Sequence, residues 1–116
     1  SFSWKEHTGY YVYIKPGDEQ RVISLFKPFF SNENITKVAQ NIKYDINVLL
    51  KYGIEVKGDL FDTMLAHYLL QPDMSHNMNF LSETYLNYRP ISIESLIGKK
   101  GKNQKHGIKL CFSEIG

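Results

Sequence analysis

The sequence lacks several features that mark specialised classes of protein. It has one cysteine, Cys111, so neither an internal disulfide nor a cysteine-rich zinc site can form. It has no uninterrupted apolar stretch of the ~18 residues that a membrane span requires. Residues 1–15 carry charged side chains where a signal peptide would have a hydrophobic segment. We therefore expect a cytoplasmic protein with no membrane partner.

Neither the net charge nor the common sequence motifs indicate a function. Lysine and arginine number 14 against 12 acidic residues, and a net charge of +2 is too small to indicate a partner. The sequence contains no P-loop, no GxGxxG and no GxSxG, so the usual phosphate-binding and nucleophile motifs are absent.

Large apolar side chains are abundant. Hydrophobic residues make up 42% of the 116 residues and aromatic residues 14%, which excludes wholesale disorder. The length corresponds to one domain or a piece of one.

The hydrophobic pattern alternates between strands and helices. It predicts a hairpin first, with a loop of five residues and a second strand that is strongly β-forming, and then an α/β order. Asp18 is a plausible cap for the first helix, Pro28 shortens it, and Gly53 marks the end of the second. The predicted strands are 1–4, 10–14 and 35–39, and 58–61 is predicted as a loop that runs into a brief strand. The predicted helices are 19–30, 42–50, 63–70, 79–87 and a short turn at 92–97.

Isolated nucleophiles and histidines give weak signals. The four histidines, at positions 7, 67, 76 and 106, have no metal-ligand spacing, and we expect each to have a surface or packing role. Cys111 lies near His106 without a pattern that would activate it, so we read it as a spare thiol.

The informative segment is 38–45, where a predicted strand ends and a helix begins. Asn41 is a good helix cap, and Asn41 and Asp45 are i and i+4 on one face of the first turns. Together with Tyr44 they project near the carboxyl edge of a sheet, where ligands bind in open α/β folds. The alternative is that Asp45 is an ordinary surface acid near the positive end of a helix dipole.

A second acid repeats this placement. Asp62 follows a short strand and precedes the helix predicted over 63–70. It could contribute to a site, but we favour a role as a helix cap.

Three segments carry a resemblance to a known family. They are 37–45 (KVAQNIKYD), 61–70 (FDTMLAHYLL) and 97–104 (IGKKGKNQ), and shorter matches lie at 52–55, 81–83 and 85–86. In this combination the sequence resembles the 3′–5′ proofreading exonuclease domain of bacterial family A DNA polymerase I, over roughly residues 20–104.

The resemblance implies a ribonuclease-H-like fold with two divalent ions, Mg²⁺ or Mn²⁺, held by four carboxylates. It implies that Asp45 is a catalytic metal ligand. It also implies that Gln40, Asn41 and Tyr44 contact the single-stranded DNA 3′ end, and that a polymerase domain is a partner in the parent chain. Asp62 matches a family position that we interpret as a structural cap.

Two motifs of the family are absent from these 116 residues. Neither Asp-x-Glu nor Tyr-x-x-x-Asp occurs, so three of the four carboxylates are missing and one aspartate cannot hold two dications. We therefore expect an incomplete fold that lacks the first strand and last helix, with a partial exonuclease domain at 1–104 and a divergent tail at 105–116. We also expect weak or no metal binding, little activity, and a possible dimer through unpaired sheet edges.

The remaining feature is a basic stretch from 89 to 109, with one arginine and five lysines against one acid. Lys99, Lys100 and Lys102 are candidates for phosphate contact, and the alternative is a solvated loop.

Three functions stay open on the sequence alone. The first is a fragment of a 3′–5′ exonuclease that removes nucleotides from a DNA 3′ end. The second is a catalytically inactive module that binds single-stranded nucleic acid or has a structural role. The third is a truncated reading frame with no function of its own.

Overall fold

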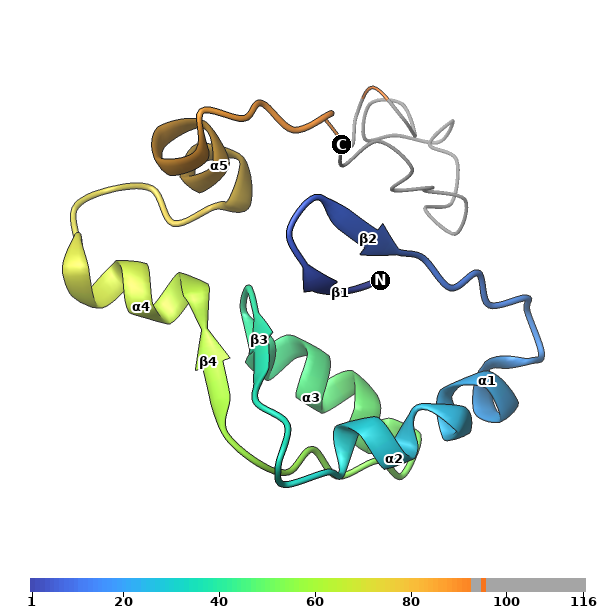
Figure 1. Ribbon diagram of the computed structural model, residues 1–116. Helices are drawn as coiled ribbons and strands as arrows, with labels where there is room; N and C mark the ends of the chain where they lie inside the picture. The colour runs from blue at the N-terminus through green and yellow to red at the C-terminus, as the bar shows by residue number, and fades with distance from the viewer. Residues whose placement is uncertain (93–94, 96–116) are drawn as a thin grey trace. The chain divides into compact units, whose positions relative to one another are not determined.

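The computed structural model describes residues 1–92 and residue 95. In this part of the chain it has four strands, in two small sheets, and five helices, which confirms a mixed α/β class (Figure 1). The contacts divide the chain into two units. The first includes Ser1–Asp18, and the second is Glu19–Pro90.

The first unit contains a short antiparallel hairpin of β1 (Phe2–Lys5) and β2 (Thr8–Tyr10). The rings of Trp4 and Tyr10 stack with centroids 4.2 Å apart and planes 4° from parallel. Such aromatic cross-strand pairs stabilise a sheet that has no other strand to pair with.

The predicted hairpin is present, but its boundaries were wrong. The turn is tighter than the predicted five-residue loop because Lys5 pairs with Thr8, and His7 in the turn adopts a positive φ of 56°. The second strand ends at Tyr10, so the predicted strand over 10–14 is largely absent. β-propensity alone cannot form a strand where no partner strand continues the ladder.

The helix predicted over 19–30 is two helices, α1 (Glu19–Leu25) and α2 (Lys27–Phe30), with Phe26 between them. Pro28 lies in the first turn of α2, where its missing N–H is not needed for a helical hydrogen bond. The proline therefore starts a new short helix, and the predicted shortening of the first helix is confirmed.

The centre of the second unit is a βαβ arrangement. β3 (Lys37–Ala39) pairs in parallel with β4 (Leu60–Asp62), and α3 (Ile42–Lys51) lies between them in sequence (Figure 1). The register places Ala39 opposite Asp62, so both strands end at the same edge. This arrangement brings the starts of two helices, α3 and the one that follows β4, to that edge.

In the strand predicted as buried, an apolar side chain is exposed and a charged side chain is buried. In β3 the side chain of Val38 is 62% exposed, whereas Lys37 is buried at 6% exposure. The Lys37 Nζ donates hydrogen bonds to the backbone oxygens of Asn32 and Lys57, and it lies 6.0 Å from the centroid of the Phe29 ring. A lysine can be buried there because backbone carbonyls replace its water.

The last two helices are α4 (Thr63–Leu70) and α5 (Met78–Leu86). The prediction of a helix over 63–70 is confirmed, and the helix predicted over 79–87 is displaced by one residue. Asn77 is the N-cap residue of α5, and its side chain accepts a hydrogen bond from the Phe80 N–H at 2.8 Å. Such a cap satisfies one of the unpaired N–H groups at the start of a helix.

Among the described residues, Ile54 is the one apolar side chain that is fully buried, at 1% exposure. Many large apolar side chains are exposed, Leu69 and Leu70 of α4 among them. The hydrophobic core of this unit is therefore small, and polar contacts between backbone segments carry an unusual share of its organisation. Within residues 1–92 and 95, no helix has the length and apolar character needed to cross a membrane.

Two glycines with positive φ allow a test of how closely two backbone segments pack beside Lys37. Gly58 (φ +85°) lies against backbone oxygens, and an added Cβ would be 2.8 Å from that of Glu33. Gly53 (φ +72°) has nothing within 4 Å of the same position. We expect Gly53→Ala to cost about 1 kcal/mol through backbone strain alone, and Gly58→Ala to cost about 1–3 kcal/mol more through overlap.

Urea unfolding of the two variants against the parent chain measures both costs. Equal losses for the two glycines would show that the loop from Asn32 to Ile35 does not pack against Gly58.

Candidate functional site

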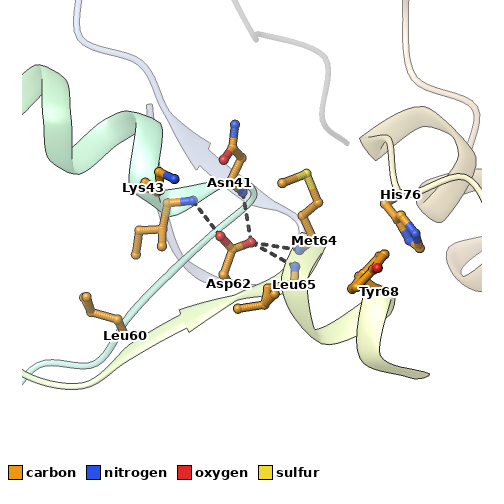
Figure 2. Close-up of a pocket in the computed structure, with 9 residues that line it drawn as sticks. Asn41, Lys43, Leu60, Asp62, Met64, Leu65, Tyr68 and His76 are labelled. Carbon is orange, nitrogen blue, oxygen red and sulfur yellow. Dashed lines mark hydrogen bonds between the residues drawn. The ribbon is translucent and has the colours of Figure 1, made fainter. Parts of the chain in front are cut away.

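The site is organised around the carboxylate of Asp62, at the end of β4 (Figure 2). Its Oδ1 accepts hydrogen bonds from the N–H groups of Met64 (2.9 Å) and Leu65 (3.3 Å), at the start of α4. The same carboxylate accepts from Asn41 (Oδ1, 3.0 Å) and Ile42 (Oδ2, 3.0 Å), at the start of α3. One side chain therefore caps two helices.

This contact changes the role expected for Asn41. Asn41 occupies the capping position of α3, but its own side chain makes no capping hydrogen bond. The predicted cap is thus wrong in its donor–acceptor pairing, because the acceptor comes from Asp62 on the neighbouring strand. Asn41 adopts a left-handed backbone conformation (φ 60°), which turns its N–H toward Asp62.

The pKa values of the two aspartates at this edge are shifted in opposite directions. Desolvation opposes ionisation of Asp62, but its four backbone N–H partners outweigh that effect and lower the pKa below the ordinary value of 3.8. For Asp45, desolvation raises the pKa above 3.8, and the negative charge of Asp62 raises it further. The two carboxylates are therefore close enough to influence each other electrostatically.

Asp45 and Tyr44 lie in the first turns of α3, directly after the strand end. The side chain of Tyr44 is 67% exposed and Asp45 is also exposed. Both side chains are therefore accessible to solvent, and their contact with a ligand stays a prediction from the sequence.

A shallow pocket of about 520 Å³ lies beside the double cap (Figure 2). Its lining includes Asn41 and Asp62, and the rings of Tyr68 and His76 lie edge to face on one side of it, with centroids 5.3 Å apart. The pocket thus collects one of the predicted contact residues, Asn41, but Asp45 and Tyr44 are not among its lining residues.

Gln40 has its polar groups directed into the protein. Its Nε2 donates to the backbone oxygen of His76 at 2.7 Å, and its Oε1 accepts from the hydroxyl of Thr63. The amide thus ties the end of β3 to the start of α4 and to the segment before α5. The prediction that Gln40 contacts nucleic acid is untested, and in this structure its amide is used for internal contacts.

A partly buried polar cluster of two histidines and a tyrosine was not predicted from the sequence. His67 is buried at 7% exposure, and its Nδ1 lies 2.6 Å from Nδ1 of His76. The His67 Nε2 lies 3.1 Å from the hydroxyl of Tyr85. One proton between the two Nδ1 atoms makes a hydrogen bond, so the pair joins α4 to the segment before α5. The proline between the two predicted helices indicates that the chain turns there, but it does not specify which side chains meet.

The acidic residues of the described part of the chain do not gather into a two-ion centre. No group of three or more histidines, cysteines or acids gathers to hold a metal within the described part of the chain. Asp62 lies at the edge where β3 and β4 end, but three N–H groups converge on its Oδ1 and one on its Oδ2. A pair of divalent ions needs more negative charge than one carboxylate provides.

The other predicted contact residues, Lys99, Lys100 and Lys102, lie outside the described residues, as do Cys111 and His106. Most of the short helical turn predicted over 92–97, and most of the basic stretch from 89 to 109, lie outside them as well.

Comparison with known proteins places these residues in a family context. A family model described as 3'-5' exonuclease matches residues 1–110. The DNA polymerase I of Borreliella burgdorferi is 34% identical over 119 residues, which cover 97% of this chain and 13% of that protein. The DNA polymerases I of Pseudomonas aeruginosa (35% over 101 residues) and Chloroflexus aurantiacus (38% over 94 residues) match 84% and 81% of the chain. The chain spans only 9–13% of the length of these three relatives.

The double cap predicts an unusually large effect for one surface-edge carboxylate. Asp62→Ala removes the acceptor of two helices, and we expect a loss of about 2–4 kcal/mol in the free energy of unfolding. Asn77→Ala removes the single cap of α5 and serves as the control, with an expected loss of about 1 kcal/mol. Urea unfolding at neutral pH measures both values, and equal losses would contradict the double cap.

The effect of Asp62 on stability also has a defined pH dependence. Because its pKa is lower in the folded protein than in the unfolded chain, its ionised form stabilises the fold. This contribution is fully present above the unfolded value of 3.8 and disappears as the pH falls through the folded value. The stability difference between the parent chain and Asp62→Ala should therefore shrink below about pH 3.8 in acid unfolding curves. A difference that stays constant there would show that the charge of Asp62 is not involved.

Proposed function

Because the chain belongs to the 3'-5' exonuclease family, we propose that it is part of a proofreading domain that binds the single-stranded 3′ end of DNA. In this role α3 presents Asp45, Asn41 and Tyr44 to the strand terminus, on a ribonuclease-H-like framework. The family match over residues 1–110 favours this function over an unrelated binding module.

The observation that best supports the proposal is the position of α3. Two residues separate the end of β3 from the start of the helix, at the edge where the parallel β4 also ends. Ligands of open α/β sheets bind at this edge. Asn41 immediately precedes α3, and Asp45 lies in the first turn of that helix.

Each side chain has a chemical role that fits a DNA terminus. The exposed ring of Tyr44 offers a surface on which a terminal base can stack. The side-chain amide of Asn41 makes no helix cap, so it can donate to a phosphate or sugar oxygen. Lys99, Lys100 and Lys102 add phosphate contacts in this proposal.

The metal chemistry of the family is a separate matter. The carboxylates of the described residues do not fit two divalent ions, so no step through a metal is assigned to this chain alone. Asp45 would be the ligand that the chain contributes to a Mg²⁺ or Mn²⁺ site in a longer polymerase. The division into 1–104 and 105–116, the cytoplasmic location, and dimerisation through sheet edges stay predictions from the sequence.

DNA binding can be tested on the chain as it stands. A 5′-labelled single-stranded oligonucleotide with a free 3′ hydroxyl, followed by fluorescence anisotropy, reports binding of the terminus. Tyr44→Ala removes the stacking surface, and we expect roughly tenfold weaker binding. Leu50→Ala, on the far part of the same helix and also exposed, should bind like the parent chain. Absent binding by the parent chain, or equal binding by all three, would contradict the proposal.

Catalysis by the isolated chain gives the second test. We expect no metal-dependent shortening of a labelled single strand in Mg²⁺ or Mn²⁺, and no tight paired site in a Mn²⁺ titration, because too few carboxylates are present. Robust degradation that Asp45→Ala abolishes would show that this chain assembles a complete active centre.

A further inference from the structure

We propose that Asp62 is a positioning residue for the DNA-binding edge, one that holds the start of α3 in register with β4 and α4 and so aims Asn41 and Asp45. The inference rests on the proposed function for its consequence, but its structural basis is independent of it. Asp62 itself is not proposed to touch DNA or metal.

The first part of the argument is the way Asp62 contacts α3. Its two oxygens accept from consecutive N–H groups, Oδ1 from Asn41 and Oδ2 from Ile42, each at 3.0 Å. Two parallel hydrogen bonds to one carboxylate define the direction of the peptide as well as its distance. A single cap would leave the helix start free to rotate about one contact.

The second part is the way the carboxylate is itself held. Asp62 accepts from Met64 and Leu65 in the first turn of its own helix, α4. Its backbone pairs with Ala39 of β3 at the strand end. The carboxylate is thus fixed from one side by α4 and the sheet, and it fixes α3 on the other.

The third part is the strain that this contact supports. Asn41 has a φ of 60°, a left-handed conformation that few non-glycine residues adopt and that asparagine tolerates better than most. That conformation turns the chain from β3 into α3 and directs the Asn41 N–H toward Asp62. Loss of the acceptor removes the reason for the strained turn, so the first turn of α3 should relax.

The fourth part is what the arrangement leaves available. An asparagine before a helix ordinarily uses its side-chain oxygen to cap the helix. Here the side chain of Asn41 makes no capping bond, and Asp62 on the neighbouring strand accepts instead from the N–H groups of Asn41 and Ile42. The amide of Asn41 is therefore left for an external ligand, at a position that Asp62 determines.

The test uses the full 116-residue chain and two substitutions. Asp62→Asn keeps the shape and one acceptor oxygen but removes the charge and one oxygen acceptor, so the fold is more tolerant of it than of Asp62→Ala. Asn77→Ala, which removes the cap of α5, is the matched control for loss of a cap elsewhere. All measurements are made at a temperature where circular dichroism shows both variants folded.

The first readout needs no variant and no DNA. In an acid titration followed by ¹H–¹⁵N NMR, the amides of Asn41, Ile42, Met64 and Leu65 should shift together with a single midpoint below 3.8, since all four donate to one carboxylate. A midpoint shared only by Met64 and Leu65 would overturn the inference, because Asp62 would then cap α4 alone.

The second readout is binding of the 5′-labelled single strand with a free 3′ hydroxyl. We expect Asp62→Asn to weaken binding roughly tenfold and to move the amide signals of Asn41 and Ile42, whereas Asn77→Ala leaves both unchanged. Unchanged Asn41 and Ile42 signals, or parent-like binding, in folded Asp62→Asn would overturn the positioning role. If the parent chain binds no oligonucleotide while the four amides still shift together, the proposed function fails. The contact of Asp62 with the starts of both helices is then still confirmed.

Discussion

The carboxylate of Asp62 accepts hydrogen bonds from the first turns of two helices, and the polar edge of the second unit is built around it. The geometry follows from the parallel pairing of β3 and β4, because strands that end together also start their helices together. The unpaired N–H groups at the two helix starts would otherwise need separate acceptors or water. A single negative charge satisfies both and sits near the positive ends of both helix dipoles. The position of α3, and with it Asp45, depends on this contact.

Polar contacts have this weight because the apolar core of the unit is small. Ile54 is the one fully buried apolar side chain among the described residues, whereas Lys37 and His67 are also buried. Each of these two polar side chains is satisfied from within. Lys37 donates to two backbone carbonyls, and His67 contacts His76 and Tyr85. The unsatisfied alternatives would cost several kcal/mol each, so these contacts specify which segments lie next to one another.

The parts of the structure that could be predicted from the sequence are those with local signals. The helix over 63–70 was readable because Asp62 precedes it and a proline follows its end, and Gly53 marked the end of α3 because a left-handed residue is required there. The wrong assignments involve distant partners. Asn41 was expected to cap its own helix, but the acceptor lies 21 residues away. The burial of Lys37 depends on carbonyls of two separate loops. No periodicity in the sequence encodes such pairings.

The same reasoning separates the two aspartates of the site, which residue type alone cannot do. Asp62 ends β4 and Asp45 lies in the first turn of α3, so each belongs to a strand–helix connection in the same βαβ arrangement. A carboxylate that coordinates a cation must present its lone pairs to it, and Asp62 already directs its oxygens at four N–H groups. A cation at Oδ1 would compete with the N–H groups of Asn41, Met64 and Leu65, which already converge on that oxygen. These hydrogen bonds favour a structural role for Asp62, and in the proposed function Asp45 is the carboxylate for ligand contact.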